Sequence, residues 1–247
     1  MLLVSCNQAD IFNNTLIVNF KPKYQQQELT CDSHITQTNK LWQINQFQFY
    51  ISDVSLMADN QWHSAKFVTS AATQNSTERV ALLGGVCPQP FNWQVTLQST
   101  VPATGIKQIR FSLGVPFDLN HQNPMTQPSP LNQPDMFWTW QLGHKFMRLE
   151  LTTSQQDWIF HLGSTGCQSA SSMRAPSTQC KHPNLVDITL ENFQADKTIQ
   201  VDLFQLIRSI DFLDEPACQS EQHSALCQKL FSRLGIDAKQ QLFSVSQ

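Results

Sequence analysis

The stretch Lys145–Thr152 reads KFMRLELT, and it decides the fold class of the chain. Its apolar residues Met147, Leu149 and Leu151 alternate with polar or charged ones. In an extended chain, alternate residues point to opposite faces, so these three side chains would share one face. Such alternation is typical of antiparallel strands with one face in the core. The stretch therefore predicts a half-buried β-strand.

The same alternation recurs along the chain, which extends this prediction to the whole protein. Candidate strands are TLIVNF (15–20), QFQFYIS (46–52), IKQIRFSL (106–113), VDITLENF (186–193) and TIQVDL (198–203). Turn residues separate them at irregular intervals. We predict an all-β fold: an antiparallel β-sandwich with long loops, forming a single domain over residues 11–240.

Two short helical segments are also predicted. Residues 202–210 follow a strand and are expected to turn helical. Residues 224–235 are a better candidate, because Ala225 and three leucines fall on one side and Gly235 supplies a C-cap. We expect a disulfide between Cys218 and Cys227 to staple this C-terminal segment.

Bulk properties exclude several classes of protein. The 247 residues carry a net charge of −3, and no basic stripe is present, so nucleic acid is not an expected partner. No apolar stretch is long enough for a transmembrane helix. The hydrophobic share of 40% is enough for a substantial core.

The N-terminus, MLLVSC, resembles the cleavage site of a bacterial lipoprotein signal. The charged region and most of the apolar region of such a signal are missing. We interpret residues 1–10 as a truncated lipoprotein signal and tether, with Cys6 as the lipidation site. Contact with a membrane would then occur only through this lipid anchor. The alternative is an apolar start with a free cysteine.

The other cysteines indicate an oxidising compartment. Apart from Cys6, the chain contains an even number: Cys31, Cys87, Cys167, Cys180, Cys218 and Cys227. An even number in an exported protein implies disulfides. Local spacing favours Cys167–Cys180 and Cys218–Cys227, which leaves Cys31–Cys87. A zinc site would need CxxC-type spacing, which is absent. We expect a periplasmic or cell-surface location.

A Pro- and Asn-rich loop over residues 114–135 is the strongest functional signal in the sequence. Long ordered loops in compact domains are usually functional, and prolines stiffen this one. It carries His121 near its start and leads into MFWTW, which contains Trp138 and Trp140. In an extended segment the two indoles would share a face. Without further information, they would be ordinary core or pocket aromatics.

Motifs of the common enzyme classes are absent from the sequence. It has no GxSxG, HExxH, P-loop or GxGxxG motif. Among the seven histidines, His121 and His161 are the best metal-ligand candidates. His121 begins the stiff loop, and His161 lies in a strand-like segment, WIFHLGSTGC, that ends in a cysteine. His34, His182 and His223 lie in polar stretches and are interpreted as surface residues.

Four segments together resemble a known family. They are GVPFDLNHQNP, SPLNQPDMFWTWQLGHKFMRLE, FHLGSTGC and CQSEQHSALCQKLFSRLG. In this order they resemble the metallo-mystery-pair proteins, which are MbnP-like and carry a four-Cys motif. The resemblance runs from about Leu16 to Gly235, and the four cysteines would be Cys167, Cys180, Cys218 and Cys227. One departure is His144, where the family commonly has tyrosine; it would add a ligand or be a neutral exchange.

The resemblance implies a function. Members are exported, β-rich proteins encoded with a di-haem peroxidase related to MauG. This partner oxidises a tryptophan to kynurenine, whose amino group binds copper together with histidine imidazoles. The implied copper site consists of His121, His161 and a kynurenine made from Trp138 or Trp140, with Trp138 preferred. Asn120, Gln122 and Gln141 are expected to orient the imidazoles. The protein would serve copper acquisition or homeostasis, and it would be a substrate of the peroxidase rather than an enzyme.

Two other classes of function remain open from the sequence. A metal-free β-sandwich could use the two tryptophans to recognise a glycan or a protein. Glycan binding without any copper binding would support this class of function. An undetected hydrolase would instead show activity that a single carboxylate or serine substitution removes.

Overall fold

The computed structural model describes residues 14–37, 39–69 and 75–246. It is mostly β, with 44% strand and 11% helix. The strands are β1 (Asn14–Tyr24), β2 (Gln27–Glu28), β3 (His34–Gln37), β4 (Lys40–Ala58), β5 (Gln61–Phe67), β6 (Val80–Val86), β7 (Gln94–Ser99), β8 (Gln108–Leu113), β9 (Phe137–Thr139), β10 (Gly143–Thr152), β11 (Asp157–Gly163), β12 (Val186–Glu191), β13 (Ile199–Asp202), β14 (Ala217–Cys218) and β15 (Phe243–Val245). The helices are α1 (Phe117–Asn120), α2 (Leu203–Ile207) and α3 (Ala225–Leu234), with 3₁₀ turns at Ala103–Gly105 and Pro134–Met136. Cys6 lies outside the described residues.

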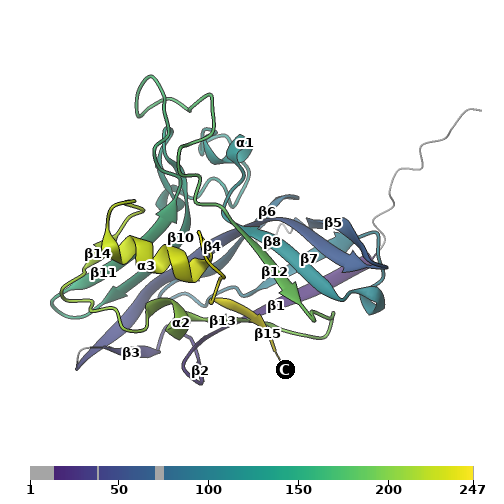
Figure 1. The fold of residues 1–247 in the computed structure, drawn as a ribbon, viewed down its shortest axis with the longest axis horizontal. Coiled ribbons are helices and arrows are strands. Elements are labelled where there is room, and N and C mark those ends of the chain that lie inside the picture. Colours follow the sequence, from purple (N-terminus) through teal and green to yellow (C-terminus); the bar gives the residue numbers. More distant parts are fainter. Residues whose placement is uncertain (1–13, 38, 70–74, 247) are drawn as a thin grey trace, which may run out of the picture.

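The strands form one strongly curled sheet, a half-barrel, rather than the predicted pair of antiparallel sheets (Figure 1). Most neighbours are antiparallel, but β1 pairs with β13 and β11 pairs with β14 in parallel. The prediction of a β-rich fold is confirmed, and that of a purely antiparallel sandwich is wrong. Alternation shows that one face of each strand is buried, and a curled sheet satisfies this requirement as well as two stacked sheets do.

The long strand β4 explains how a single sheet curls. Its first half pairs with β10 and β6, whereas its second half pairs with β8 and β5. Between these halves the register with β8 shifts from Ser52 to Ser55, and Asp53 has a positive φ of 49°. An irregularity of this kind bends a strand and increases its twist. Because β4 bends, it can take part in both halves of the sheet.

The core is formed by the apolar face that the alternation predicts. Met147, Leu149 and Leu151 of β10 are fully buried, and so are Phe47 and Phe49 of the neighbouring β4. Aromatic rings fill the hollow of the curled sheet, with Phe20, Phe49, Phe111 and Phe243 in edge-to-face contacts. Burial of such side chains is the main stabilising contribution to folding.

The C-terminal helix forms where it was predicted. The Ser224 side chain accepts a hydrogen bond from the backbone N–H of Cys227, and Gly235 closes α3 in the left-handed conformation with φ 111°. Ala225, which was grouped with the leucines, is exposed, and Phe231 joins the buried face instead. The helix lies beside the β11 and β14 end of the sheet (Figure 1).

Three disulfides join the cysteines in the pairs that local spacing favours. They are Cys31–Cys87, Cys167–Cys180 and Cys218–Cys227. Such a set is typical of proteins in an oxidising compartment. Within the described ranges, no helix has the length and apolar character that crossing a bilayer requires.

Candidate metal centre

The candidate site lies at the end of the sheet where the long loops project (Figure 1). The loop over residues 114–135 leaves β8, forms α1 and returns through a 3₁₀ turn to β9. Two hydrogen-bond acceptors in this loop are held by buried side chains. The Tyr50 hydroxyl donates to the Pro130 carbonyl at 2.9 Å, and His144 Nε2 lies 2.9 Å from the Leu131 carbonyl. The loop is thus anchored to the rigid sheet, as a positioned ligand would require.

His121 directly follows α1 and is 5% exposed. Its Nε2 lies 3.2 Å from Nδ2 of Asn120, and its Nδ1 lies 3.3 Å from the Trp140 carbonyl oxygen. The Asn120 amide nitrogen can only donate, so Nε2 is the acceptor and Nδ1–H donates to Trp140. Burial lowers the pKa of His121, which keeps the imidazole neutral. Nε2 is therefore the nitrogen of His121 with a lone pair.

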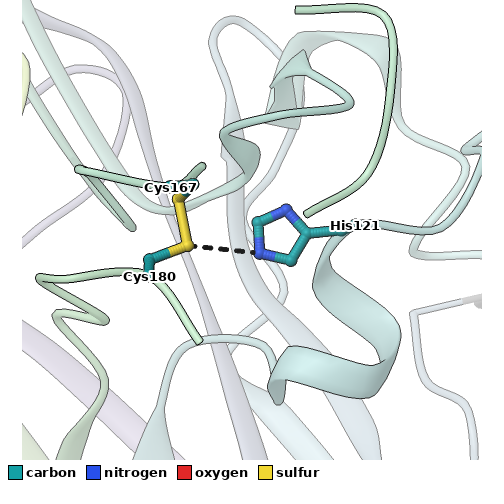
Figure 2. Close-up of side chains that lie close together, drawn as sticks. All are labelled: His121, Cys167 and Cys180. Carbon is teal, nitrogen blue, oxygen red and sulfur yellow. Dashed lines mark hydrogen bonds between the residues drawn. A yellow bond between two sulfur atoms is a disulfide. The ribbon is translucent and has the colours of Figure 1, made fainter. Parts of the chain in front are cut away.

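A disulfide lies against this nitrogen. Nε2 of His121 is 3.6 Å from Sγ of Cys180, which is disulfide-bonded to Cys167 (Figure 2). The three ligand-type atoms of His121, Cys167 and Cys180 all lie within 4.8 Å of one another, as do those of Cys218, Glu221 and Cys227. Metal ligation by cysteine requires thiolates, and these sulfurs are disulfide-bonded. The first group therefore offers one imidazole nitrogen to a metal ion.

Asn120 organises the loop side of the site and is 1% exposed. Its side-chain oxygen accepts the backbone N–H of His144 at 2.7 Å, while its amide nitrogen faces His121 and the Ser164 hydroxyl. Gly143 makes this close packing feasible: it has a positive φ of 79°, and a Cβ there would lie 2.5 Å from the Asn120 oxygen.

His144, which stands where the resembled family commonly has tyrosine, is fully buried. Nδ1 lies 2.9 Å from the Asn120 carbonyl oxygen and Nε2 lies 2.9 Å from the Leu131 carbonyl oxygen. Burial lowers the pKa of His144. A neutral imidazole has one N–H, so His144 donates to one of these carbonyl oxygens and thereby anchors the loop, while the other carbonyl oxygen lies against its second nitrogen.

His161 lies on β11 and is 6% exposed. Its Nε2 is 2.7 Å from the carboxylate of Glu150, whereas its Nδ1 is buried without a hydrogen-bond partner. Burial lowers the pKa of His161. His63 Nε2 is likewise buried without a partner, but His161 is the one of these two that contacts a predicted site tryptophan. A buried nitrogen without a protein partner is costly, so it is a candidate position for a bound ion or an ordered water.

Trp138 is the tryptophan that packs beside His161. The two ring centroids are 6.4 Å apart, and the indole also rests on Gly163, where a Cβ would lie 2.5 Å from Cζ3 of Trp138. Trp140 reaches the site differently, through its carbonyl oxygen near His121. Strand β9 ends at Thr139, so Trp140 lies in a turn, and the two indoles are not in one extended segment as the sequence suggested.

The predicted residues thus form two adjacent groups. His161 and Trp138 form one group, and His121 joins Asn120 and Trp140 in the other; the contacts within the described ranges include none between His121 and His161. The two groups are linked at the end of β11: Gly163 packs against Trp138, so that a Cβ there would lie 2.5 Å from the indole, and the next residue, Ser164, contacts Asn120. Of the three expected orienting residues, Asn120 contacts an imidazole, whereas Gln141 binds the Cys167 carbonyl and Gln122 binds the Asp118 carbonyl.

Substitution of Asn120 by alanine is expected to lower the free energy of unfolding. The buried N–H of His144 would lose its acceptor, which costs about 1–3 kcal/mol. Urea unfolding would measure the difference. Asn19→Ala, which removes an exposed hydrogen bond to Gln94, is the matched control and should have little effect. Equal stability of the two variants would show that the hydrogen bond from the His144 N–H to Asn120 does not stabilise the fold.

Comparison with known proteins agrees with the resemblance seen in the motifs. The family model for MbnP matches residues 13–221. The fold is similar to that of MbnP from Methylosinus trichosporium, with a TM-score of 0.76 over 94% of this chain and 98% of that chain, at 19% sequence identity. No curated protein sequence matches the chain. From the family model and the site motifs together, the chain belongs to the MbnP family.

Proposed function

We propose that this protein is an exported copper-binding protein whose site is matured by oxidation of Trp138 to kynurenine. The oxidising partner is a di-haem peroxidase related to MauG, and the protein is its substrate rather than a catalyst. The function served is copper acquisition or homeostasis. Family membership supports this class of function, and the geometry around His161 supports the choice of residues.

The observation that carries the proposal is the buried Nδ1 of His161, which has no hydrogen-bond partner. Imidazole nitrogen is a good ligand for copper, and copper stands at the top of the affinity series of divalent first-row metals. The residues present therefore fit the metal. Copper, when bound, would satisfy this nitrogen, and the surrounding side chains would exclude water.

Trp138 cannot ligate a metal in its unmodified form, because an indole N–H is a donor only. Cleavage of the indole C2–C3 bond by the peroxidase, with hydrogen peroxide as the oxidant, would add one oxygen atom to each carbon and give N-formylkynurenine. Hydrolysis would then release the formyl group as formate and leave an aniline-type amine with a usable lone pair. Trp138 packs beside His161, so the new amine would belong to a side chain that neighbours the proposed ligand. Oxidation would thus switch the site on.

His121 supplies the third nitrogen in this proposal. Its lone pair is on Nε2, which accepts a hydrogen bond from Asn120 at 3.2 Å, a distance at the long end of the normal range. Ligation would require His121 to exchange this contact for the metal. Asn120, the neighbour of His121, contacts the hydroxyl of Ser164, which directly follows β11, so the segments that carry the two histidines are linked.

Export and anchoring belong to the same proposal. The three disulfides fit a periplasmic or cell-surface location, and Cys6 would carry the lipid that anchors the chain.

Alanine substitution of either histidine tests the ligand set. His121→Ala and His161→Ala are each expected to abolish stoichiometric copper binding in protein produced with the peroxidase. Copper bound per protein molecule would be measured by elemental analysis after dialysis. His223→Ala, on the exposed surface, is the control and should bind copper as the unsubstituted protein does. Tight copper binding by both His121→Ala and His161→Ala would overturn the ligand set.

A further inference from the structure

A charged cluster lies behind His161 on the same face of the sheet. In the pairing of β10 with β11, Arg148 is directly opposite His161, and Glu150 is two residues further along β10. Residues two apart on one strand share a face, so these three side chains are neighbours. Their side chains are 13%, 16% and 8% exposed for Arg148, Glu150 and His161 respectively. Charged side chains with so little exposure to water are stable only when opposite charges and hydrogen bonds compensate for the lost hydration.

A single carboxylate oxygen of Glu150 contacts both Arg148 and His161. Oε1 of Glu150 accepts from Nε of Arg148 at 2.9 Å and from Nη2 of the same guanidinium, and it lies 2.7 Å from Nε2 of His161. The Arg148 guanidinium, which has donors only, donates two N–H groups to this oxygen. Oε1 is therefore an acceptor in these contacts.

This geometry fixes which nitrogen of His161 carries the proton. The Glu150 oxygen that lies 2.7 Å from Nε2 is an acceptor, so Nε2 carries a proton. A second proton, on Nδ1, would place a buried N–H where it has no acceptor. The lone pair is consequently on Nδ1, which is the atom that has no partner.

Arg148 also connects this cluster to the turn that precedes Trp138 in the chain. Its Nη1 donates to the Asp135 carbonyl oxygen at 2.7 Å, in the 3₁₀ turn that leads directly into β9. The Lys145 ammonium donates to the same oxygen at 2.8 Å. Arg148 thus holds the turn before Trp138 with one nitrogen and the Glu150 carboxylate with two others.

We propose that Glu150, fixed by Arg148, is a positioning residue that holds His161 as the Nε2–H tautomer and presents Nδ1 as its metal-binding atom. The role in ligation rests on the copper function proposed above, whereas the tautomer is a property of the metal-free protein. Carboxylates that orient a ligating imidazole in this way generally change metal affinity by about 10- to 100-fold when substituted.

The first test requires neither metal nor a variant at Glu150. In metal-free ¹⁵N-labelled protein at neutral pH, long-range ¹H–¹⁵N correlation spectra distinguish a protonated from an unprotonated ring nitrogen. The His161 signals are assigned by their loss in His161→Gln. We expect Nε2 to be protonated and Nδ1 unprotonated. A protonated Nδ1 would overturn the proposal, whatever the protein does with copper.

The second test uses Glu150→Gln, which keeps the shape of the side chain but removes its charge. Because an amide can donate as well as accept, both tautomers of His161 should become populated, and copper affinity of the peroxidase-matured protein should fall about 10- to 100-fold. Glu191→Gln, on the exposed end of β12, is the matched control and should change neither quantity. An unchanged tautomer or an unchanged copper affinity in Glu150→Gln would overturn the positioning role. A wild-type protein with the Nε2–H tautomer that never binds copper would instead refute the proposed function alone.

Discussion

Trp138→Phe is expected to abolish copper binding, and Trp140→Phe is expected to preserve it. Phenylalanine fills part of the indole volume but has no pyrrole ring from which an amine can be made. Trp138 packs beside His161, whereas the described contact of Trp140 with the site is through its backbone carbonyl, which any residue supplies. Only the first substitution should therefore remove a ligand.

Both variants would be produced together with the peroxidase. Copper per protein molecule would be measured by elemental analysis, and the modified tryptophan would be located by peptide mass spectrometry. The opposite pattern, with copper lost in Trp140→Phe and kept in Trp138→Phe, would transfer the modification to Trp140. The packing of Trp138 beside His161 would then play no role in copper binding.

Gly163→Ala is expected to damage both stability and the site. A Cβ at this position would lie 2.5 Å from the Trp138 ring and 2.9 Å from the His144 carbonyl oxygen. Either the indole or the β10 backbone must move, and overpacking of this kind costs about 1–3 kcal/mol. Displacement of Trp138 from His161 should also reduce copper binding.

Gly105→Ala is the matched control for this substitution. Its added Cβ would meet only the Ala58 Cβ, at an ordinary contact distance of 3.8 Å. Urea unfolding and tryptophan fluorescence would compare the two variants. If Gly163→Ala were as stable as Gly105→Ala, with unchanged fluorescence, the packing of Trp138 on Gly163 would be refuted.

The elements of the fold were largely predictable, because local patterns determine them. The alternation through Met147, Leu149 and Leu151 predicts β10 and its buried face, and Gly235 predicts the end of α3. The joining of these strands into one curled sheet was not predictable. It depends on the bend of β4 near Asp53 and on the parallel pairing of β1 with β13, which are contacts between distant residues.

The candidate site was predictable in its residue types but not in its arrangement. His161 and Trp138 were both candidates, yet nothing in their spacing shows that the ring of Trp138, rather than that of Trp140, lies beside His161. The turn after Thr139 separates the two indoles. The contact of Glu150 with His161 follows from the register of β10 and β11, which only the folded sheet defines. Alternation alone places Glu150 on the face of β10 opposite Leu149 and Leu151, and it does not show which side chain Glu150 contacts.

The most direct test of the copper proposal is the metal content of the protein produced alone and together with the proposed partner, a di-haem peroxidase related to MauG. The account predicts about one copper ion per molecule after co-production, bound through the nitrogen-ligand chemistry that suits this metal, and little copper without it. Equal copper in both preparations would contradict the need for an oxidised tryptophan. Absence of copper from both would contradict the copper function itself and would favour a metal-free recognition module.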